Sequence, residues 1–148
     1  MKSKNTIRLM FIFFVLSSFS MNAQTTPKPY SDGTVWQVSF IKLKPNAGDD
    51  YLKSLAVTWR KAHEEAIKQS IIIGYKVLRG QAANNDDWDI MLMAQYKNMG
   101  AMDNISDKWD AIYKTVVGTD EQQKTLNQNR VSLRDIYGGK IVREVIFN

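Results

Sequence analysis

Residues 49–69, DDYLKSLAVTWRKAHEEAIKQ, decide how this chain folds, because they read as one amphipathic helix with a face for burial. Asp49 and Asp50 occupy the first turn, where carboxylates interact favourably with the positive end of a helix. Apolar residues recur at a spacing of three and four, at Leu52, Leu55, Trp59, Ala62 and Ala66. This spacing predicts a helix whose apolar side chains fill an arc of about 160°.

The only histidine of the chain, His63, falls inside this arc, one turn after Trp59 and one turn before Ile67. Imidazole is the side chain best suited to acid–base or metal chemistry near neutral pH. His63 is therefore a candidate catalytic residue, as a general base, and a candidate haem ligand. The alternative interpretation is a histidine packed at the margin of the core and hydrogen-bonded to backbone.

The size and composition of the chain are those of one globular domain. The 148 residues are 44% hydrophobic and 24% charged, which is ordinary for a protein with its own core. The absence of cysteine excludes disulfides, thiolate catalysis, iron–sulfur clusters and thiolate zinc sites. It also excludes a lipoprotein anchor, which requires a cysteine at the cleavage point.

Residues 1–23 are typical of a secretory signal peptide. The segment begins with three basic residues, Lys2, Lys4 and Arg8. An apolar run from Leu9 to Leu16 follows, and Ala23 supplies a small residue before the expected cut at Gln24. The run is shorter than the about 20 residues that span a bilayer. We expect an exported protein, periplasmic or secreted, without a stable membrane anchor after cleavage; the alternative is an uncleaved anchor.

The charge of the chain does not favour a nucleic-acid partner. The formal net charge is +5, but removal of the three basic residues of the signal peptide leaves 17 basic residues against 15 acidic ones. No basic stripe with interleaved aromatic residues remains. We therefore expect no nucleic acid among the partners.

Periodicity and turn residues divide the rest of the chain into strands and helices. Residues 24–33 form a polar lead-in that we expect to be mobile. The pattern predicts strands at 34–43, 71–78, 88–96 and 140–147, and helices at 49–69, 100–116 and 120–137. Asn98 is expected to cap the second helix, and Thr119 with Gln122 forms a capping-box pattern at the third. The short loop after residue 78 predicts an antiparallel hairpin.

This order of elements predicts an α+β fold over residues 34–148. Strand, helix, strand, strand, helix, extra helix, strand is the ferredoxin-like βαββαβ pattern with one helix inserted before the last strand. The helices of such a unit cover one face of the sheet. The other face should be polar if it meets water, but Met91 and Met93, and also Val142 and Ile146, place apolar side chains there. A second copy of the same sheet is the simplest cover, so we expect a homodimer.

The domain resembles the dimeric α/β-barrel superfamily. The resemblance is carried by VWQVSFIKLKP (35–45), IIIGYKVL (71–78), DDWDIMLMAQY (86–96), YKNMGAMDN (96–104) and KIVREVIFN (140–148). It implies two ferredoxin-like subunits that pair their open sheet faces as a dimeric α/β barrel. The superfamily includes cofactor-free monooxygenases, haem-binding and haem-degrading proteins and stress-response proteins, so the resemblance leaves the function open.

The space between the helix 49–69 and the sheet is the natural place for a ligand pocket. Trp59 and His63 face this space, and Tyr75 or Tyr113 could reach it, so we take these four as candidate ligand-binding residues. Aromatic walls suit a small, largely apolar molecule. Trp59 and the other tryptophans, Trp36, Trp88 and Trp109, could equally be ordinary core residues. No cofactor is expected; haem is the alternative, although haem-degrading relatives usually place the axial histidine on the second helix.

The predicted function is therefore that of an exported homodimer that binds a small, largely apolar molecule. The alternatives are a cofactor-free monooxygenase or isomerase-like enzyme that uses His63, a haem-binding protein, and a structural or interaction module. No metal site is expected, because the acidic loop from Asn84 to Asp89 lacks the spacing and the glycine of a calcium loop. None of the common nucleotide-binding or hydrolase motifs is present.

Overall fold

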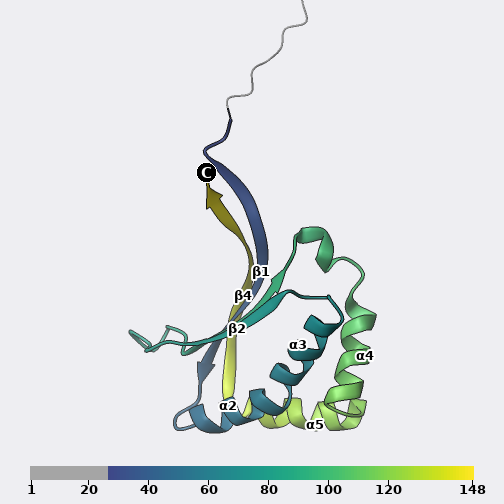
Figure 1. Cartoon of the computed structure of the whole chain (residues 1–148). Coiled ribbons are helices and arrows are strands. Elements are labelled where there is room, and N and C mark those ends of the chain that lie inside the picture. The colour runs from purple at the N-terminus through teal and green to yellow at the C-terminus, as the bar shows by residue number, and fades with distance from the viewer. Residues whose placement is uncertain (1–26) are drawn as a thin grey trace, which may run out of the picture.

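The computed structural model describes residues 27–148, so the predicted signal peptide at residues 1–23 lies outside the described residues. One antiparallel sheet, with the strand order β2-β3-β1-β4, contains β1 (Tyr30–Leu43), β2 (Gly74–Arg79), β3 (Ile90–Tyr96) and β4 (Arg134–Phe147). The helices are α2 (Gly48–Val57), α3 (Trp59–Lys68), the 3₁₀-helix η1 (Met99–Met102), α4 (Ser106–Val116) and α5 (Asp120–Val131). Figure 1 shows α3 and α4 on one side of the sheet and α2 and α5 across its lower end. This topology confirms the predicted ferredoxin-like α+β class, with α5 as the extra helix before the last strand.

The core lies between the sheet and the helices, in two clusters. The first joins α3 and α4 to the sheet and contains Val35, Ala62, Ala66, Ile71, Ile72, Ala94, Tyr96 and Ile112. The second joins α2 to the sheet and contains Ile41, Tyr51, Leu55, Ile90 and Leu92. The predicted apolar face of residues 49–69 therefore packs on the sheet, because its three- and four-residue spacing matches one side of a helix.

The predicted single helix over 49–69 is wrong in one respect, because the helix is interrupted at Thr58. Thr58 has φ −120° and ψ −83°, which separates α2 from α3. Its backbone N–H donates to the carbonyl of Leu55, and its Oγ1 donates to the carbonyl of Ser54 at 2.7 Å. The hydroxyl thereby satisfies the carbonyl of Ser54, which loses its usual helical partner because the N–H of Thr58 bonds to Leu55 instead.

The last strand begins earlier than predicted. We expected a helix to Tyr137 and a strand only from Lys140, whereas α5 ends at Val131 and β4 begins at Arg134. β4 pairs with β1 along its length, from Arg134 opposite Leu43 to Phe147 opposite Tyr30. The same pairing extends β1 back to Tyr30, so the last residues of the expected mobile lead-in belong to a strand. Backbone pairing between distant segments has overridden local helix propensity here.

Gly138 and Gly139 lie inside β4 and do not end a helix as expected. Gly138 has φ +145°, a conformation that a side chain would strain, beside the irregular register at Phe40 and Ile41. A Cβ on Gly139 would lie 2.8 Å from the carbonyl oxygen of Val38. The two glycines therefore allow β4 to approach β1 closely through a bulge.

Other predicted bounds and caps need smaller corrections. The predicted helix over 100–116 is two elements, η1 and α4, and Asn98 caps η1 by accepting from the N–H of Ala101 at 2.9 Å. The capping box of Thr119 and Gln122 is confirmed at the start of α5. β2 and β3 begin at Gly74 and Ile90, after residues 71–73 and 88–89 that we had assigned to strands.

The sheet face away from α3 and α4 carries Trp36, Val38, Phe40, Met91, Met93 and Val142, as the register between the strands requires. On this face Glu144 accepts hydrogen bonds from Thr34 and from the indole N–H of Trp36, at 2.6 and 2.9 Å. Arg143, which points to the opposite side, pairs with Asp32 at 2.5 Å.

The edge strand β4 exposes apolar side chains on both of its faces. The exposed residues are Ile136, Tyr137, Ile141, Val142, Val145, Ile146 and Phe147. Only β1 pairs with β4, so one edge of this 14-residue strand has free backbone groups within the described chain. A long, apolar, unpaired edge is a surface that proteins normally cover.

Candidate functional site

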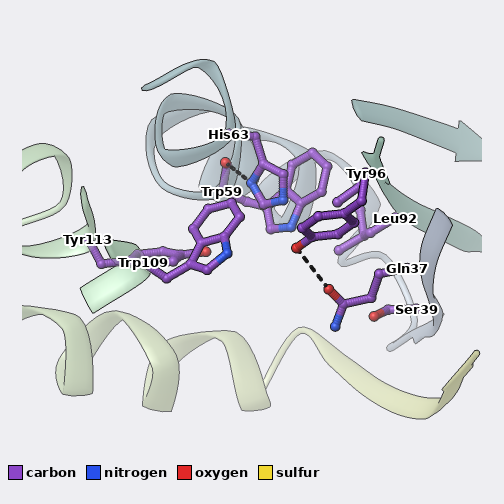
Figure 2. A pocket seen from close by; sticks show the side chains of 9 residues that line it. Gln37, Ser39, Trp59, His63, Leu92, Tyr96, Trp109 and Tyr113 are labelled. Atoms are coloured by element: carbon purple, nitrogen blue, oxygen red, sulfur yellow. Dashed lines mark hydrogen bonds between the residues drawn. The ribbon is translucent and has the colours of Figure 1, made fainter. Parts of the chain in front are cut away.

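A cavity of about 280 Å³ lies between α3, α4 and the inner face of the sheet (Figure 2). Its walls are formed by Gln37, Ser39, Trp59, His63, Leu92, Ala94, Tyr96, Trp109 and Tyr113. Two walls are helical and two come from the neighbouring strands β1 and β3. The cavity exists because the small side chains Ser39 and Ala94 face large aromatic ones from the helices.

His63 is the polar centre of this cavity. It is 6% exposed, and its ring stacks on Trp59 with 3.7 Å between ring centroids and 26° between planes. Its Nδ1 lies 2.8 Å from the carbonyl oxygen of Trp59. Because a carbonyl only accepts, Nδ1 carries the proton, and the neutral ring keeps Nε2 as an unprotonated acceptor.

Burial controls the charge of His63. Desolvation lowers the pKa of His63 to about 4, although the backbone hydrogen bond to Trp59 acts in the opposite direction. The imidazole is therefore neutral near pH 7. A base whose conjugate acid has so low a pKa accepts a hydrogen bond well but removes protons poorly at neutral pH.

Helix α4 contributes an aromatic wall that faces His63. The rings of Trp109 and His63 lie 5.0 Å apart, and Tyr113 follows one turn later with its ring 6.1 Å from that of Trp109. Burial raises the pKa of Tyr113, so its hydroxyl stays protonated. The cavity thus presents aromatic faces from two helices (Figure 2).

The sheet contributes polar groups that sequence reasoning did not assign to the site. Tyr96 donates a hydrogen bond to Oε1 of Gln37 at 3.3 Å, and Ser39 lies on the same face of β1 (Figure 2). A signal for them exists in the sequence. Gln37 and Ser39 are polar at alternate positions between Val35 and Ile41, on a strand face that is otherwise buried.

The four predicted ligand-binding residues do not all meet in the cavity. Trp59, His63 and Tyr113 line it, whereas Tyr75 does not. Tyr75 packs edge-on against Trp59 at 5.3 Å and lies 5.9 Å from His63, while its hydroxyl donates to Glu64 at 3.3 Å. Tyr75 therefore supports the Trp59–His63 stack from outside the cavity.

The tryptophans divide between the two faces of the sheet. Trp59 and Trp109 line the cavity, while Trp36 lies on the opposite face beneath the Nζ of Lys76, 5.1 Å from its ring. Trp88 packs against Phe40 with 6.1 Å between ring centroids. Only two of the four tryptophans are thus placed to contact a ligand in this cavity.

The acidic hairpin loop is held by its own hydrogen bonds. Asp87 accepts from the N–H groups of Ala83 and Trp88, both at 2.9 Å, and these bonds lower its pKa. Across residues 27–148, no group of three or more histidine or acidic side chains gathers as metal ligands do. In the same part of the chain, every helix is too short or too polar to span a bilayer.

Comparison with known proteins shows the fold alone. No protein-family model matches the chain, and no curated protein matches it in sequence. Among solved structures, a NIPSNAP family protein of unknown function from Agrobacterium tumefaciens str. C58 is similar over 78% of this chain and 92% of its own, with a TM-score of 0.53 and 13% identity. A dimeric ferredoxin-like protein from an uncultured marine organism is also similar, over 78% of this chain and 90% of its own, with a TM-score of 0.48 and 14% identity. A protein from Shewanella oneidensis is similar over 79% of this chain and 98% of its own, with a TM-score of 0.49 and 14% identity.

Proposed function

We propose that this protein binds a small, largely apolar molecule in the cavity between α3, α4 and the sheet. The observation that carries the proposal is a neutral His63, whose Nε2 is left as a hydrogen-bond acceptor in an aromatic cavity. Apolar cavities with a few placed polar groups are the usual form of small-molecule sites. The ligand then has a flat apolar body and a hydroxyl or N–H that donates to Nε2.

The dimensions of the cavity restrict the ligand further. A volume of about 280 Å³ is just below the range of about 300–1,000 Å³ that is typical of ligand sites. One or two fused rings match this volume, and a macrocycle as large as haem does not. We therefore propose no haem cofactor, and titration of the purified protein with hemin should leave the Soret band as in buffer. A shifted, saturable Soret band would contradict this.

We favour a binding function over a catalytic one because the buried His63 is a weak base. A cofactor-free oxygenase or an isomerase-like enzyme needs a base near pH 7, whereas burial lowers the pKa of His63 to about 4. The same group is suitable for holding a ligand hydroxyl, because acceptance of a hydrogen bond needs only the neutral ring.

We further propose that the protein is an exported homodimer. The apolar, unpaired strand β4 supports a partner copy, because a second sheet would cover the face and edge that this strand exposes. The sequence of residues 1–23 supports export. Fractionation of cells that express the full chain with a C-terminal tag should recover it outside the cytoplasm, with its mass reduced by that of residues 1–23. Recovery at full length in the cytoplasm would contradict export.

Calorimetric titration with 1-naphthaleneacetamide, a neutral two-ring probe, tests the ligand pocket. We expect saturable binding that His63→Ala and Trp109→Ala each weaken at least about tenfold, which is the effect of losing one good contact in a buried site. Trp88→Ala removes an equal ring from outside the cavity and is the matched control. Unchanged affinity in His63→Ala, with the fold intact by circular dichroism, would overturn the proposal.

A further inference from the structure

A second cavity, also of about 280 Å³, lies beside the aromatic one, between α4 and α5. It is lined by Tyr113, Val117, Gln123, Leu126, Asn127 and Arg130. Tyr113 lines both cavities, so its ring is their common wall. The guanidinium of Arg130 is the only charged group in the lining of the second cavity, and it donates to Oδ1 of Asn127.

Arg134 places a second positive charge close to Arg130. It begins β4 directly after α5, and its guanidinium lies over the ring of Tyr51, 5.6 Å from the centroid. Burial and the neighbouring charge of Arg134 both lower the pKa of Arg130. Arg134 follows Arg130 by only four residues, and both side chains are partly withdrawn from water.

Neither arginine has a carboxylate partner among residues 27–148. The ion pairs of the described residues involve other basic groups, and the Nε atoms of Arg130 and Arg134 are buried without any acceptor. A buried, unsatisfied donor on a cation is costly, and two like charges side by side add to that cost. Arginine groups left in this state are the usual recognition element for carboxylates and phosphates.

We propose that the ligand of the aromatic cavity carries an acidic oxygen group, which passes Tyr113 and binds Arg130, with Arg134 contributing the second positive charge. This inference rests on the proposed function and makes it more specific. The ligand class is a small amphipathic acid whose one- or two-ring body carries the hydroxyl or N–H that donates to Nε2 of His63. The body lies against Trp59, His63 and Trp109, and its oxyanion accepts from Arg130.

Two matched probes test this inference, namely 7-hydroxy-1-naphthaleneacetate and 7-hydroxy-1-naphthaleneacetamide, which both carry a ring hydroxyl that can donate to His63 and differ only in the acid group. Calorimetric titration of the unmodified protein should show the acid binding at least about tenfold more tightly than the amide. Arg130→Gln and Arg134→Gln should each remove most of this preference while the affinity for the amide stays within about twofold. Arg130→Lys keeps the charge without the two-pronged geometry and should give an intermediate preference.

Lys124→Gln is the control, because it removes one exposed positive charge from the same helix without touching the second cavity. The preference for the acid should persist in this variant. The thermal midpoint of ligand-free Arg130→Gln should equal or exceed that of the unmodified protein, since an unpaired buried charge is removed.

The outcomes separate the two proposals. Equal affinity of the unmodified protein for both probes, or an acid preference that survives Arg130→Gln and Arg134→Gln, would overturn the acid site and leave the aromatic pocket standing. Binding of neither probe would overturn the pocket and the acid site together. A lowered midpoint of Arg130→Gln, with equal binding of both probes, would assign the arginine to structure.

Discussion

The charge state of His63 is set by a balance between burial and one hydrogen bond. The ring is packed between Trp59 and Trp109, so protonation would place a charge away from water. The carbonyl of Trp59 favours the proton on Nδ1 but does not compensate fully, and the pKa of His63 falls to about 4. The residue that looked most like a base in the sequence is therefore better described as a neutral acceptor.

This low pKa predicts a pH-dependent stability. Between about pH 6.5 and pH 4 the unfolded chain protonates His63 while the folded protein does not, so the free energy of unfolding decreases as the pH falls through this window. The loss attributable to His63 amounts to about 3 kcal/mol at pH 4 and levels off below it, once the folded protein is protonated as well. Urea denaturation across this range measures it.

The variant His63→Phe isolates this effect, because it keeps the stack on Trp59 and cannot be protonated. As the pH falls from 6.5 to 4, the free energy of unfolding of the variant should rise relative to that of the unmodified protein. A gap that stays constant with pH would contradict a depressed pKa, as would an NMR titration of the imidazole with a midpoint near 6.5.

Within the elements, the break at Thr58 explains how α2 and α3 follow the sheet. The hydroxyl of Thr58 satisfies the carbonyl of Ser54, which no helical N–H reaches because the N–H of Thr58 bonds to Leu55. Thr58 is fully buried, so water cannot replace this bond. The threonine thus satisfies the backbone group that the interruption of the helix leaves free.

Replacement of the hydroxyl by a methyl group should therefore be costly at this position. Thr58→Val should lower the free energy of unfolding by about 1–3 kcal/mol, the cost of a buried polar group without a partner. Urea denaturation checks this.

Thr115→Val is the matched control, because Thr115 makes the same bond to Ala111 at 2.9 Å on an exposed, uninterrupted helix. The Thr115→Val substitution should change the free energy of unfolding by less than about 0.5 kcal/mol. Equal effects of the two substitutions would show that the hydroxyl of Thr58 does not support the break.

At the scale of the whole molecule, a monomer would leave the strand β4 exposed. Val142 on the outer face and Ile141 on the inner face are 41% and 53% exposed, and the strand ends with Phe147 at 79%. Long edge strands in monomers are usually protected by charges, proline or a covering element. Lys140, Arg143 and Glu144 interrupt the apolar run but do not cover it.

Light scattering should therefore give a mass of twice the single chain, and Val142→Asp should convert the protein to a monomer or an aggregate. A carboxylate buried in an apolar interface without a partner costs several kcal/mol. Val57→Asp makes the same change at a 53% exposed position on α2 and should leave the mass unchanged. A stable monomer of the unmodified protein would contradict the homodimer.

The type and order of the elements, and the inward direction of Trp59 and His63, were determined by the sequence alone. These follow from local periodicity, which requires only that a helix or strand bury one face. The start of β4 at Arg134 was decided by pairing with β1 about a hundred residues away. The meeting of Trp109 and Gln37 around His63 likewise depends on how distant elements pack. No pattern within one segment encodes such contacts, so only the tertiary structure could reveal them.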